Sequence, residues 1–255
     1  MDGVESLPTI LTKEFAILAR EKDFVAITKP PGYHVHQPEF PRRRVSKDVI
    51  CLQILRAQIE EYLFPVHRID VATEGVLVFA LNKESASALC QQFQNGVVKK
   101  TYFTIVRGWA DDEGVIDIPL ELDSTEVPVP SLTRYKTHQR VELPFAVGKR
   151  HATARYSLVE AWPETGRYHQ IRRHFGRLSH PVVGDREHGD SNHNRFFREK
   201  LGEGGLWLKA HAIEFDHPAD GTKVRIGSEW SERWLRMFDK LGFSVPTSAR
   251  GGDQP

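Results

Sequence analysis

The sequence predicts an α+β fold with a mixed, largely antiparallel sheet and flanking helices. Its short apolar runs have the length of strands, and a few other segments show helical spacing, but the two kinds do not alternate regularly as in a parallel βαβ sheet. The 255 residues, 40% of them hydrophobic, are enough to build one substantial core. We expect a single catalytic domain over residues 14–245, with tails at 1–13 and 246–255.

The N-terminal part predicts a hairpin followed by a helix. FAILAR (15–20) and FVAITK (24–29) are apolar runs separated by a polar turn, and Pro30-Pro31-Gly32 ends the second run. Residues 46–63 place apolar side chains at mostly helical spacing, with Ser46 as a candidate N-cap. We therefore expect one helix there.

The middle of the chain predicts two strands around a helix. VLVFAL (76–81) has the continuous apolar character of a buried strand, and SASALCQQFQ (85–94) is typical of a helix that ends at Asn95-Gly96. TYFTIVRG (101–108) follows as a strand that we expect to pair beside 76–81. Residues 111–149 are rich in proline, so short strands joined by loops are expected there.

The C-terminal part predicts four further elements. RYSLVEAW (155–162) has strand character, and QIRRHFGRL (170–178) predicts a short helix. LWLKAHAIEFDHP (206–218) predicts a strand with a turn. SEWSERWLRMFDKLGF (228–243) has the pattern of an amphipathic terminal helix.

Charge is divided unevenly along the chain, although the formal net charge is only +1. Residues 111–126 hold seven acids and no Lys or Arg, so this segment should face away from a polyanion. Residues 149–200 hold eleven Lys and Arg against six acids, together with half of the histidines. This basic segment is a candidate nucleic-acid footprint, and an ordinary solvated face is the alternative.

The sequence contains no sign of export or of a membrane span. It lacks a long apolar run, and MDGVESLPTILTKEF at its start has no basic segment followed by an apolar core, as a secretory signal requires. Cys51 and Cys90 are too few and too far apart for a disulfide framework. We expect a cytoplasmic protein with no membrane association.

Three separated motifs carry the candidate chemistry. PVHRIDVATEG (65–75) places a His, an Arg and an Asp in a polar loop before the strand at 76–81. Taken alone, it could be a salt-bridged turn. KKTYFTIVRGW (99–109) and ETGRYHQIRRHFGRLSHPVVGDREHGD (164–190) supply a Tyr and a dense set of Arg and His.

Together these motifs resemble the RluA family of pseudouridine synthases. In that family HRLD with a following Thr and Gly, a KxY strand, and GRxHQIRxH followed by HPxxGD recur in this order. The resemblance covers residues 14–240 and implies the pseudouridine synthase catalytic fold and isomerisation of uridine in RNA. It implies no cofactor, no metal ion and no protein partner, so we expect a monomer.

The tRNA-modifying members of the family are the most similar. QQFQNGVVKKTYFTIVRGW (91–109) and SNHNRFF (191–197) carry this closer resemblance, and no small RNA-binding domain is expected before the catalytic part. The resemblance implies tRNA as substrate and uridine 65 in the T-stem as target. A family member acting on rRNA is the alternative.

The family pattern assigns the catalytic roles to Asp70, Tyr102 and Arg172. An ionised carboxylate suits a reaction that detaches uracil from ribose without redox chemistry or a metal. Arg172 would keep Asp70 charged and oriented, and Tyr102 would stack on the uracil and help exchange the proton at the rebonding carbon. Residue types alone allow Asp70 to attack the ribose, add to the base or withdraw a sugar proton.

Further residues are expected to bind the substrate. A target in a stem must be flipped out of the helix, and Arg68 would fill the gap that the base leaves. His67 would order the loop, while Arg167, Arg173 and the run Arg42 to Arg44 would hold phosphates. A structural ion pair at Arg68 and a core role for Tyr102 are the alternatives.

Two positions depart from the family pattern, and two other function classes remain open. Glu74 stands where Ser is usual, and Lys209 stands where a late LHA motif usually has His. One rival class is a metal-dependent hydrolase, because many potential ligands crowd one segment, namely His169, His174, His180, Asp185, His188, Asp190 and His193. The other is an RNA-binding protein that has lost catalysis.

Overall fold

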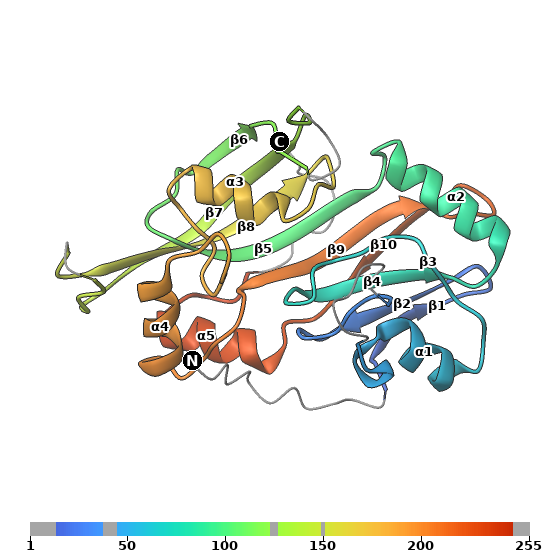
Figure 1. Cartoon of the computed structure of the whole chain (residues 1–255), viewed down its shortest axis with the longest axis horizontal. Helices are drawn as coiled ribbons and strands as arrows, with labels where there is room; N and C mark the ends of the chain where they lie inside the picture. Colours follow the sequence, from blue (N-terminus) through green and yellow to red (C-terminus); the bar gives the residue numbers. More distant parts are fainter. Residues whose placement is uncertain (1–13, 38–44, 123–126, 149–150, 247–255) are drawn as a thin grey trace.

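The computed structural model describes residues 14–37, 45–122, 127–148 and 151–246. Within these ranges the fold is a ten-stranded sheet in the order β1-β2-β4-β9-β5-β8-β7-β6, with β3 on β4 and β10 on β9 (Figure 1). The pairing is antiparallel except between β4 and β9. The expected tails fall almost wholly outside the described residues.

The strands divide into two groups, one on each side of the β4–β9 contact. The first group holds β1 (Ile17–Arg20), β2 (Phe24–Lys29), β3 (Phe64–Pro65) and β4 (Glu74–Ala80). The second holds β5 (Lys99–Arg107), β6 (Glu113–Asp117), β7 (Leu132–Leu143), β8 (Ala154–Pro163), β9 (Leu208–Asp216) and β10 (Lys223–Gly227). The helices are η1 (Lys47–Val49), α1 (Cys51–Ile59), α2 (Lys83–Gln94), α3 (Gln170–Arg177), α4 (Ser191–Glu199) and α5 (Glu232–Leu241).

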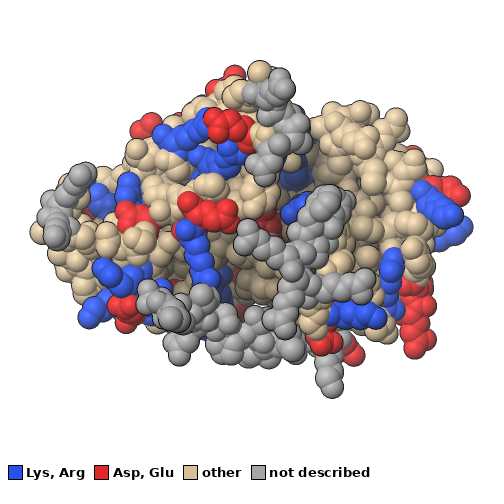
Figure 2. Space-filling view, in the orientation of Figure 1, with Lys and Arg blue, Asp and Glu red and all other residues tan. Residues whose placement is uncertain are grey.

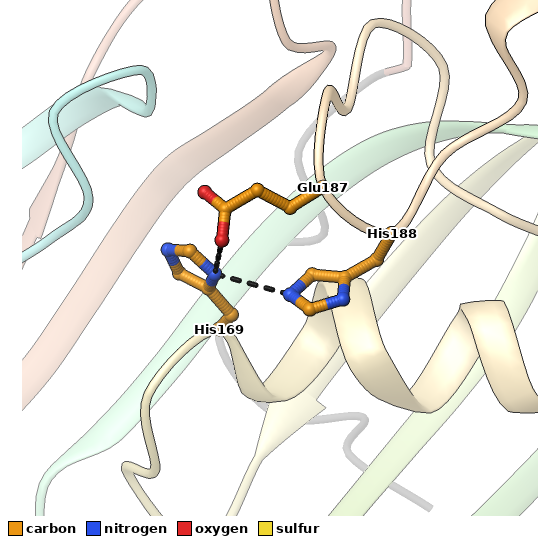
Figure 3. Close-up of side chains that lie close together, drawn as sticks. All are labelled: His169, Glu187 and His188. Atoms are coloured by element: carbon orange, nitrogen blue, oxygen red, sulfur yellow. Dashed lines mark hydrogen bonds and ion pairs between the residues drawn. The ribbon is translucent and has the colours of Figure 1, made fainter. Parts of the chain in front are cut away.

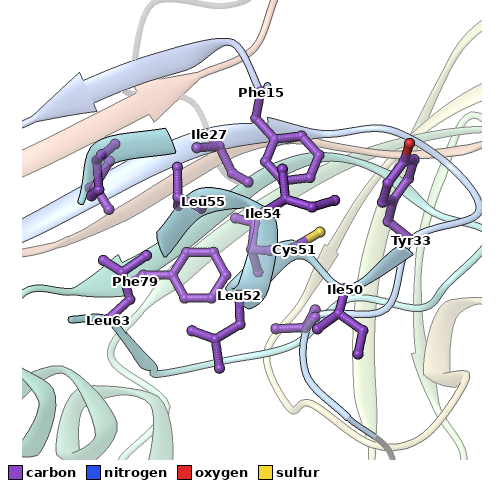
Figure 4. Packing of buried hydrophobic residues seen from close by; sticks show 14 residues of the cluster. Phe15, Ile27, Tyr33, Ile50, Cys51, Leu52, Ile54, Leu55, Leu63 and Phe79 are labelled. Atoms are coloured by element: carbon purple, nitrogen blue, oxygen red, sulfur yellow. The ribbon is translucent and has the colours of Figure 1, made fainter. Parts of the chain in front are cut away.

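Alternate residues of a strand point to opposite faces of the sheet, and helices pack against both faces. In β2, Val25 and Ile27 pack in one cluster with α1 (Figure 4), whereas Phe24 and Ala26 pack in another with Leu89 of α2. In β5, Phe103 packs in a cluster with α4 and α5. The central strands are therefore covered on both sides, whereas β6, β10 and much of β7 remain partly exposed.

The two groups of strands meet in a very short parallel ladder. Only Glu74 with Lys209 and Gly75 with Ala210 are in register between β4 and β9. Gly75 has φ +126°, and a Cβ there would lie 2.0 Å from the carbonyl oxygen of Ala210. Because a side chain could neither adopt this backbone conformation easily nor fit, glycine is required at the junction.

The structure corrects several expectations about local elements. The helix expected over 46–63 is interrupted, because Ile50 is extended and bridges His34, so that η1 and α1 are separate. The strand over 101–108 does not pair beside 76–81, since β9 lies between β5 and β4. The segment 111–149 contains the twelve-residue strand β7 rather than short strands alone.

The other predicted elements are present, and three were not expected. The hairpin at the N-terminal end, the helix after β4 and the amphipathic terminal helix are confirmed. Helix α4, capped by Asp190, and strands β3 and β10 were not predicted. No helix in the described part of the chain combines the length and apolarity needed to cross a membrane.

We expect Gly75→Ala to destabilise the fold by at least about 3 kcal/mol, because the added methyl group meets the Ala210 backbone. Gly221→Ala is the matched control, since Gly221 also has positive φ but has no atom within 4 Å of a built Cβ. It should cost only about 1 kcal/mol. Urea unfolding of both variants measures the difference, and equal losses would contradict the close-approach argument.

Candidate active site

The loop between β3 and β4 places Asp70 at the edge of the parallel junction. Asp70 is followed by a turn in which the amide of Thr73 donates to its carbonyl oxygen over 3.0 Å. Lys29, fully buried in β2, donates from Nζ to the carbonyl oxygens of Pro30, Tyr33 and Val71 at 2.9–3.1 Å. One buried ammonium group therefore fixes the backbone next to Asp70 through these hydrogen bonds.

Arg172 of α3 joins Asp70 to a second carboxylate. Its Nε and Nη2 donate to the two oxygens of Asp185 over 2.7 and 2.6 Å, and its Nη1 donates to Oδ2 of Asp70 over 3.3 Å. The Asp185 side chain is completely buried, and that of Arg172 is 6% exposed. The two-pronged contact fixes the plane of the guanidinium, so one donor remains aimed at Asp70.

Asp70 and Arg172 line a cavity of about 840 Å³, which Tyr102 also lines. Tyr102 comes from β5, where it faces α3 while its neighbour Phe103 packs on the opposite side of the sheet. Burial, with a smaller contribution from the charge of Asp70, raises the pKa of the Tyr102 hydroxyl. Tyr102 is therefore a neutral hydroxyl near pH 7.

Most of the predicted substrate-binding residues reach the same cavity. Its lining includes His67, Arg68 and Arg167. Arg173 is not part of this lining, because its Nη1 donates instead to the carbonyl oxygen of Glu121 over 2.7 Å. The run Arg42 to Arg44 lies outside the described residues.

The His67 side chain makes structural contacts rather than projecting freely into the cavity. Its Nε2 accepts a hydrogen bond of 2.9 Å from the amide of Val78, and its ring stacks on Phe93 with 4.6 Å between centroids. Burial, assisted by Lys100, lowers the pKa of His67 to about 3. The ring is thus neutral and anchors the loop to β4.

The motif analysis assigned no role in the isomerisation to three residues around Asp70, two of which, His169 and Asp185, it named only as potential metal ligands. His169 places Nε2 3.8 Å from Oδ2 of Asp70, and Asp185 holds Arg172. Lys100 lines the cavity, and burial lowers the pKa of its ammonium group to about 8. All three stand in the quoted motifs, but spacing along the chain carries no information on which side chains meet Asp70.

The residues of the rival metal site are mostly dispersed. His174 contacts Thr133 and the carbonyl of Ile118, His180 contacts the carbonyl of Arg107, and His193 contacts Tyr156. Asp190 caps α4. His169 and His188 do come together, with Glu187 beside them (Figure 3).

Glu74 and Lys209, the two residues that depart from the family pattern, contact each other. Glu74 and Lys209 are in register across the parallel junction, and Lys209 Nζ lies 3.3 Å from Oε1 of Glu74. Both side chains are buried, at 5% and 0% exposed. Ser231 donates to the same carboxylate over 3.0 Å, and Arg233 lies 3.8 Å from it.

The surface around the site carries both signs of charge. On the face shown in Figure 2, Lys and Arg lie among Asp and Glu rather than in one unbroken patch. Several arginines of the basic segment are already paired, such as Arg172 with Asp185 and Arg155 with Glu142. Any electrostatic attraction of a polyanion must therefore come from fewer side chains than the sequence count suggests.

The sequence matches the family described as RNA pseudouridylate synthase over residues 23–177. It is 40% identical over 237 residues to tRNA pseudouridine synthase C of Vibrio cholerae, which is 89% of this chain and 96% of that protein. For the same-named protein of Haemophilus ducreyi, the identity is 38% over 239 residues, or 90% and 97% of the two chains.

Other similar proteins agree with these matches. A tRNA pseudouridine synthase C of Pectobacterium carotovorum is 38% identical over 237 residues, which is 89% of this chain but only 62% of that longer protein. The fold is similar to Human RNA Pseudouridylate Synthase Domain Containing 4, with a TM-score of 0.66, 25% identity and coverage of 91% and 95%. For Domain Containing 1 the TM-score is 0.68 at 22% identity, with coverage of 92% and 98%.

We expect Glu74→Gln and Lys209→Met each to destabilise the fold by roughly 3 kcal/mol, because each leaves a buried charge without its main partner. The double variant should lose clearly less than the sum, because neither charge remains. The same cycle on the exposed pair Lys223 and Asp216 should give a coupling below about 1 kcal/mol. Denaturant unfolding measures both cycles, and additive losses at Glu74 and Lys209 would refute the coupling.

We expect His67 to make the fold sensitive to acid. Below pH 6.5 His67 takes up a proton in the unfolded chain but not in the folded chain. The free energy of unfolding therefore decreases as the pH falls toward 3. His67→Gln keeps an acceptor for the Val78 amide and should lose less stability between pH 7 and 5, by at most about 1.4 kcal/mol per pH unit.

The measurement for His67 is the free energy of unfolding in urea at pH 7, 6 and 5. The matched control is His151→Gln, because His151 is exposed. This control should follow the wild type. Identical pH dependence of His67→Gln and the wild type would show that His67 is not buried in the neutral form.

Proposed function

The chain belongs to the RNA pseudouridylate synthase family, as its resemblance to the RluA members predicts, and on this premise we propose that it converts uridine 65 in the T-stem of tRNA to pseudouridine. The observation that carries the proposal is the meeting of Asp70, Tyr102 and Arg172, from three distant segments, at one cavity. Support for tRNA comes from the similarity to relatives named tRNA pseudouridine synthase C.

Asp70 is proposed as the catalytic carboxylate. The isomerisation breaks the bond between N1 of uracil and C1′ of ribose, forms one from C5 to C1′, and moves a proton from C5 to N1. An anionic carboxylate next to the ribose can attack C1′, add to the ring or withdraw a sugar proton, and each route returns it unchanged. No redox partner is needed for any of them.

Arg172 is proposed to orient Asp70 through the reaction. Asp185 takes two of its donors, so the remaining contact of 3.3 Å to Asp70 is held in direction but is longer than a tight ion pair. A guanidinium fixed in this way compensates the charge of Asp70 without enclosing it. One face of the carboxylate stays open to the cavity.

Tyr102 is proposed to stack on the uracil and to assist proton exchange at C5. Its neutral hydroxyl can relay the C5 proton by donating its own proton as it receives that one, so that no charge remains beside Asp70. An aromatic face that lines the cavity suits a planar base.

The target base is proposed to leave the stem and enter the cavity. The volume of about 840 Å³ lies within the usual range for small-molecule sites, about 300–1,000 Å³. Arg68 is exposed at this cavity and would fill the gap in the helix, while His67 holds its loop. Arg167, which precedes α3, and Arg173, which lies within it, would bind phosphates.

We further propose that residues 14–245 act as one catalytic domain and as a cytoplasmic monomer. The cavity supports a single domain, because both groups of strands contribute to it: Asp70 precedes β4, and Tyr102 lies in β5. A second copy of the chain is not needed to complete the proposed site.

We expect Asp70→Asn to abolish pseudouridine formation while RNA binding changes less than about threefold, because the amide keeps the size of the side chain but cannot act as an anion. Tritium release from 5-tritiated uridine in tRNA measures the reaction, and filter binding measures affinity. Asp112→Asn is the matched control, since Asp112 is exposed, pairs with Arg140 and lies outside the cavity lining. Unchanged activity of Asp70→Asn would overturn the assignment.

The target is tested by mapping pseudouridine in total RNA from cells with and without the protein. Loss at position 65 of tRNA, restored by the wild type but not by Asp70→Asn, is the expected result. Loss confined to an rRNA site would instead identify the rRNA-modifying alternative. Binding to tRNA without any change in the map would identify a non-catalytic RNA-binding protein.

A further inference from the structure

The geometry points to a binding site for a divalent cation of the zinc type, formed by His169, Glu187 and His188 beside Asp70. We infer that this site is inhibitory rather than essential, which rests on the proposed role of Asp70. The three side chains come from the start of α3 and from the loop after Asp185 (Figure 3).

The spacing of the potential ligand atoms fits tetrahedral coordination. Nδ1 of His169 lies 3.2 Å from Nε2 of His188 and 3.5 Å from Oε2 of Glu187. With metal bonds of about 2.0–2.2 Å, the ligand atoms of a tetrahedral zinc site lie roughly 3.3–3.6 Å apart. The remaining separation is within 4.8 Å, and the Glu187 side chain, 57% exposed, can rotate to close it.

The two ring nitrogens of His169 face different partners. Nδ1 faces Glu187 and His188, whereas Nε2 lies 3.8 Å from Oδ2 of Asp70, so a cation on Nδ1 would leave the Nε2 proton directed toward that carboxylate. The ring is buried and stacks on Tyr168 with 3.7 Å between centroids. His169 is therefore already oriented as a ligand.

The backbone that carries the other two ligands is also fixed. The amides of Glu187 and His188 both donate to Oδ1 of Asp185, over 2.9 and 3.1 Å. Gly189 closes the turn so tightly that a Cβ there would lie 2.1 Å from the Asp185 carbonyl oxygen. The loop thus needs little ordering when a cation binds.

The charges around the cluster favour a cation on balance. Arg172 opposes it, because Nη2 lies 3.5 Å from the second oxygen of Glu187. Against this stand the carboxylates of Asp70 and Asp185, which contact Arg172, and that of Glu187 itself. Among these direct contacts three carboxylates face one guanidinium, so a divalent ion would reduce a negative excess there, although Arg68 and Lys100 line the wider cavity.

A bound cation would act on Asp70 through His169. It would pull Glu187 away from Arg172, hold His169 rigidly beside Asp70 and place two positive charges near the carboxylate that the reaction needs free. Exposed Glu187 lets the ion enter from solvent. We therefore expect zinc to inhibit pseudouridine formation and a chelator to reverse the inhibition.

Binding is tested on the full chain by titration with Co²⁺, whose visible absorption reports tetrahedral nitrogen and oxygen coordination. We expect one equivalent to bind, with the signal displaced by Zn²⁺, and about tenfold or greater weakening in His188→Gln. His151→Gln, at an exposed histidine outside the cluster, should bind like the wild type. Equal binding by His188→Gln and the wild type would overturn the site.

Inhibition is tested by measuring pseudouridine formation with added Zn²⁺, each variant being compared with its own rate in chelator. The wild type and His151→Gln should lose activity and regain it with chelator, whereas His188→Gln should need about tenfold more zinc. Equal sensitivity of all three would refute the inhibitory role. A wild type that binds Co²⁺ but forms no pseudouridine under any condition would instead refute the proposed function and leave the cation site standing.

Discussion

Arg172 determines the arrangement of the candidate site, because its guanidinium group contacts two carboxylates in different ways. Asp185 is fully buried and takes two hydrogen bonds, while Asp70 is reached by a single longer one. Asp185 also receives the amides of Glu187 and His188. One buried acid thus fixes α3, the loop that follows it and, through Arg172, the direction of Asp70.

The sheet supplies the second constraint. Two groups of strands meet in a parallel ladder of two residue pairs, and Gly75 permits the contact because it has no side chain. Asp70 precedes one strand of this junction, and Tyr102 lies on the strand beyond the other. The cavity lies between the C-terminal end of α2 and the N-terminal end of α3, and residues of β5 and β9 also line it.

Sequence patterns predicted which residues line the cavity more completely than they predicted the contacts between those residues. Asp70, Tyr102 and Arg172 stand in motifs whose order is informative, and they line one cavity. The motifs could not show that Arg173 lies outside the cavity lining, because its partner, the carbonyl oxygen of Glu121, comes from a distant loop. Ile50 interrupts a regular helical pattern because His34 pairs with its backbone, and α4 lacks the long apolar stripe that reveals a helix. Each such feature depends on a tertiary contact.

The buried pair of Glu74 and Lys209 has a consequence for how the sequence can change over generations. A lineage with Ser and His at these positions would have to pass through a protein with one buried charge and no matching opposite charge across the junction. Ser231 and Arg233 already contact Glu74, so the acid could arise first and the lysine afterwards. In the reverse order the Lys209 ammonium would lack the Glu74 carboxylate across the junction, so each order passes through an intermediate with one unmatched buried charge.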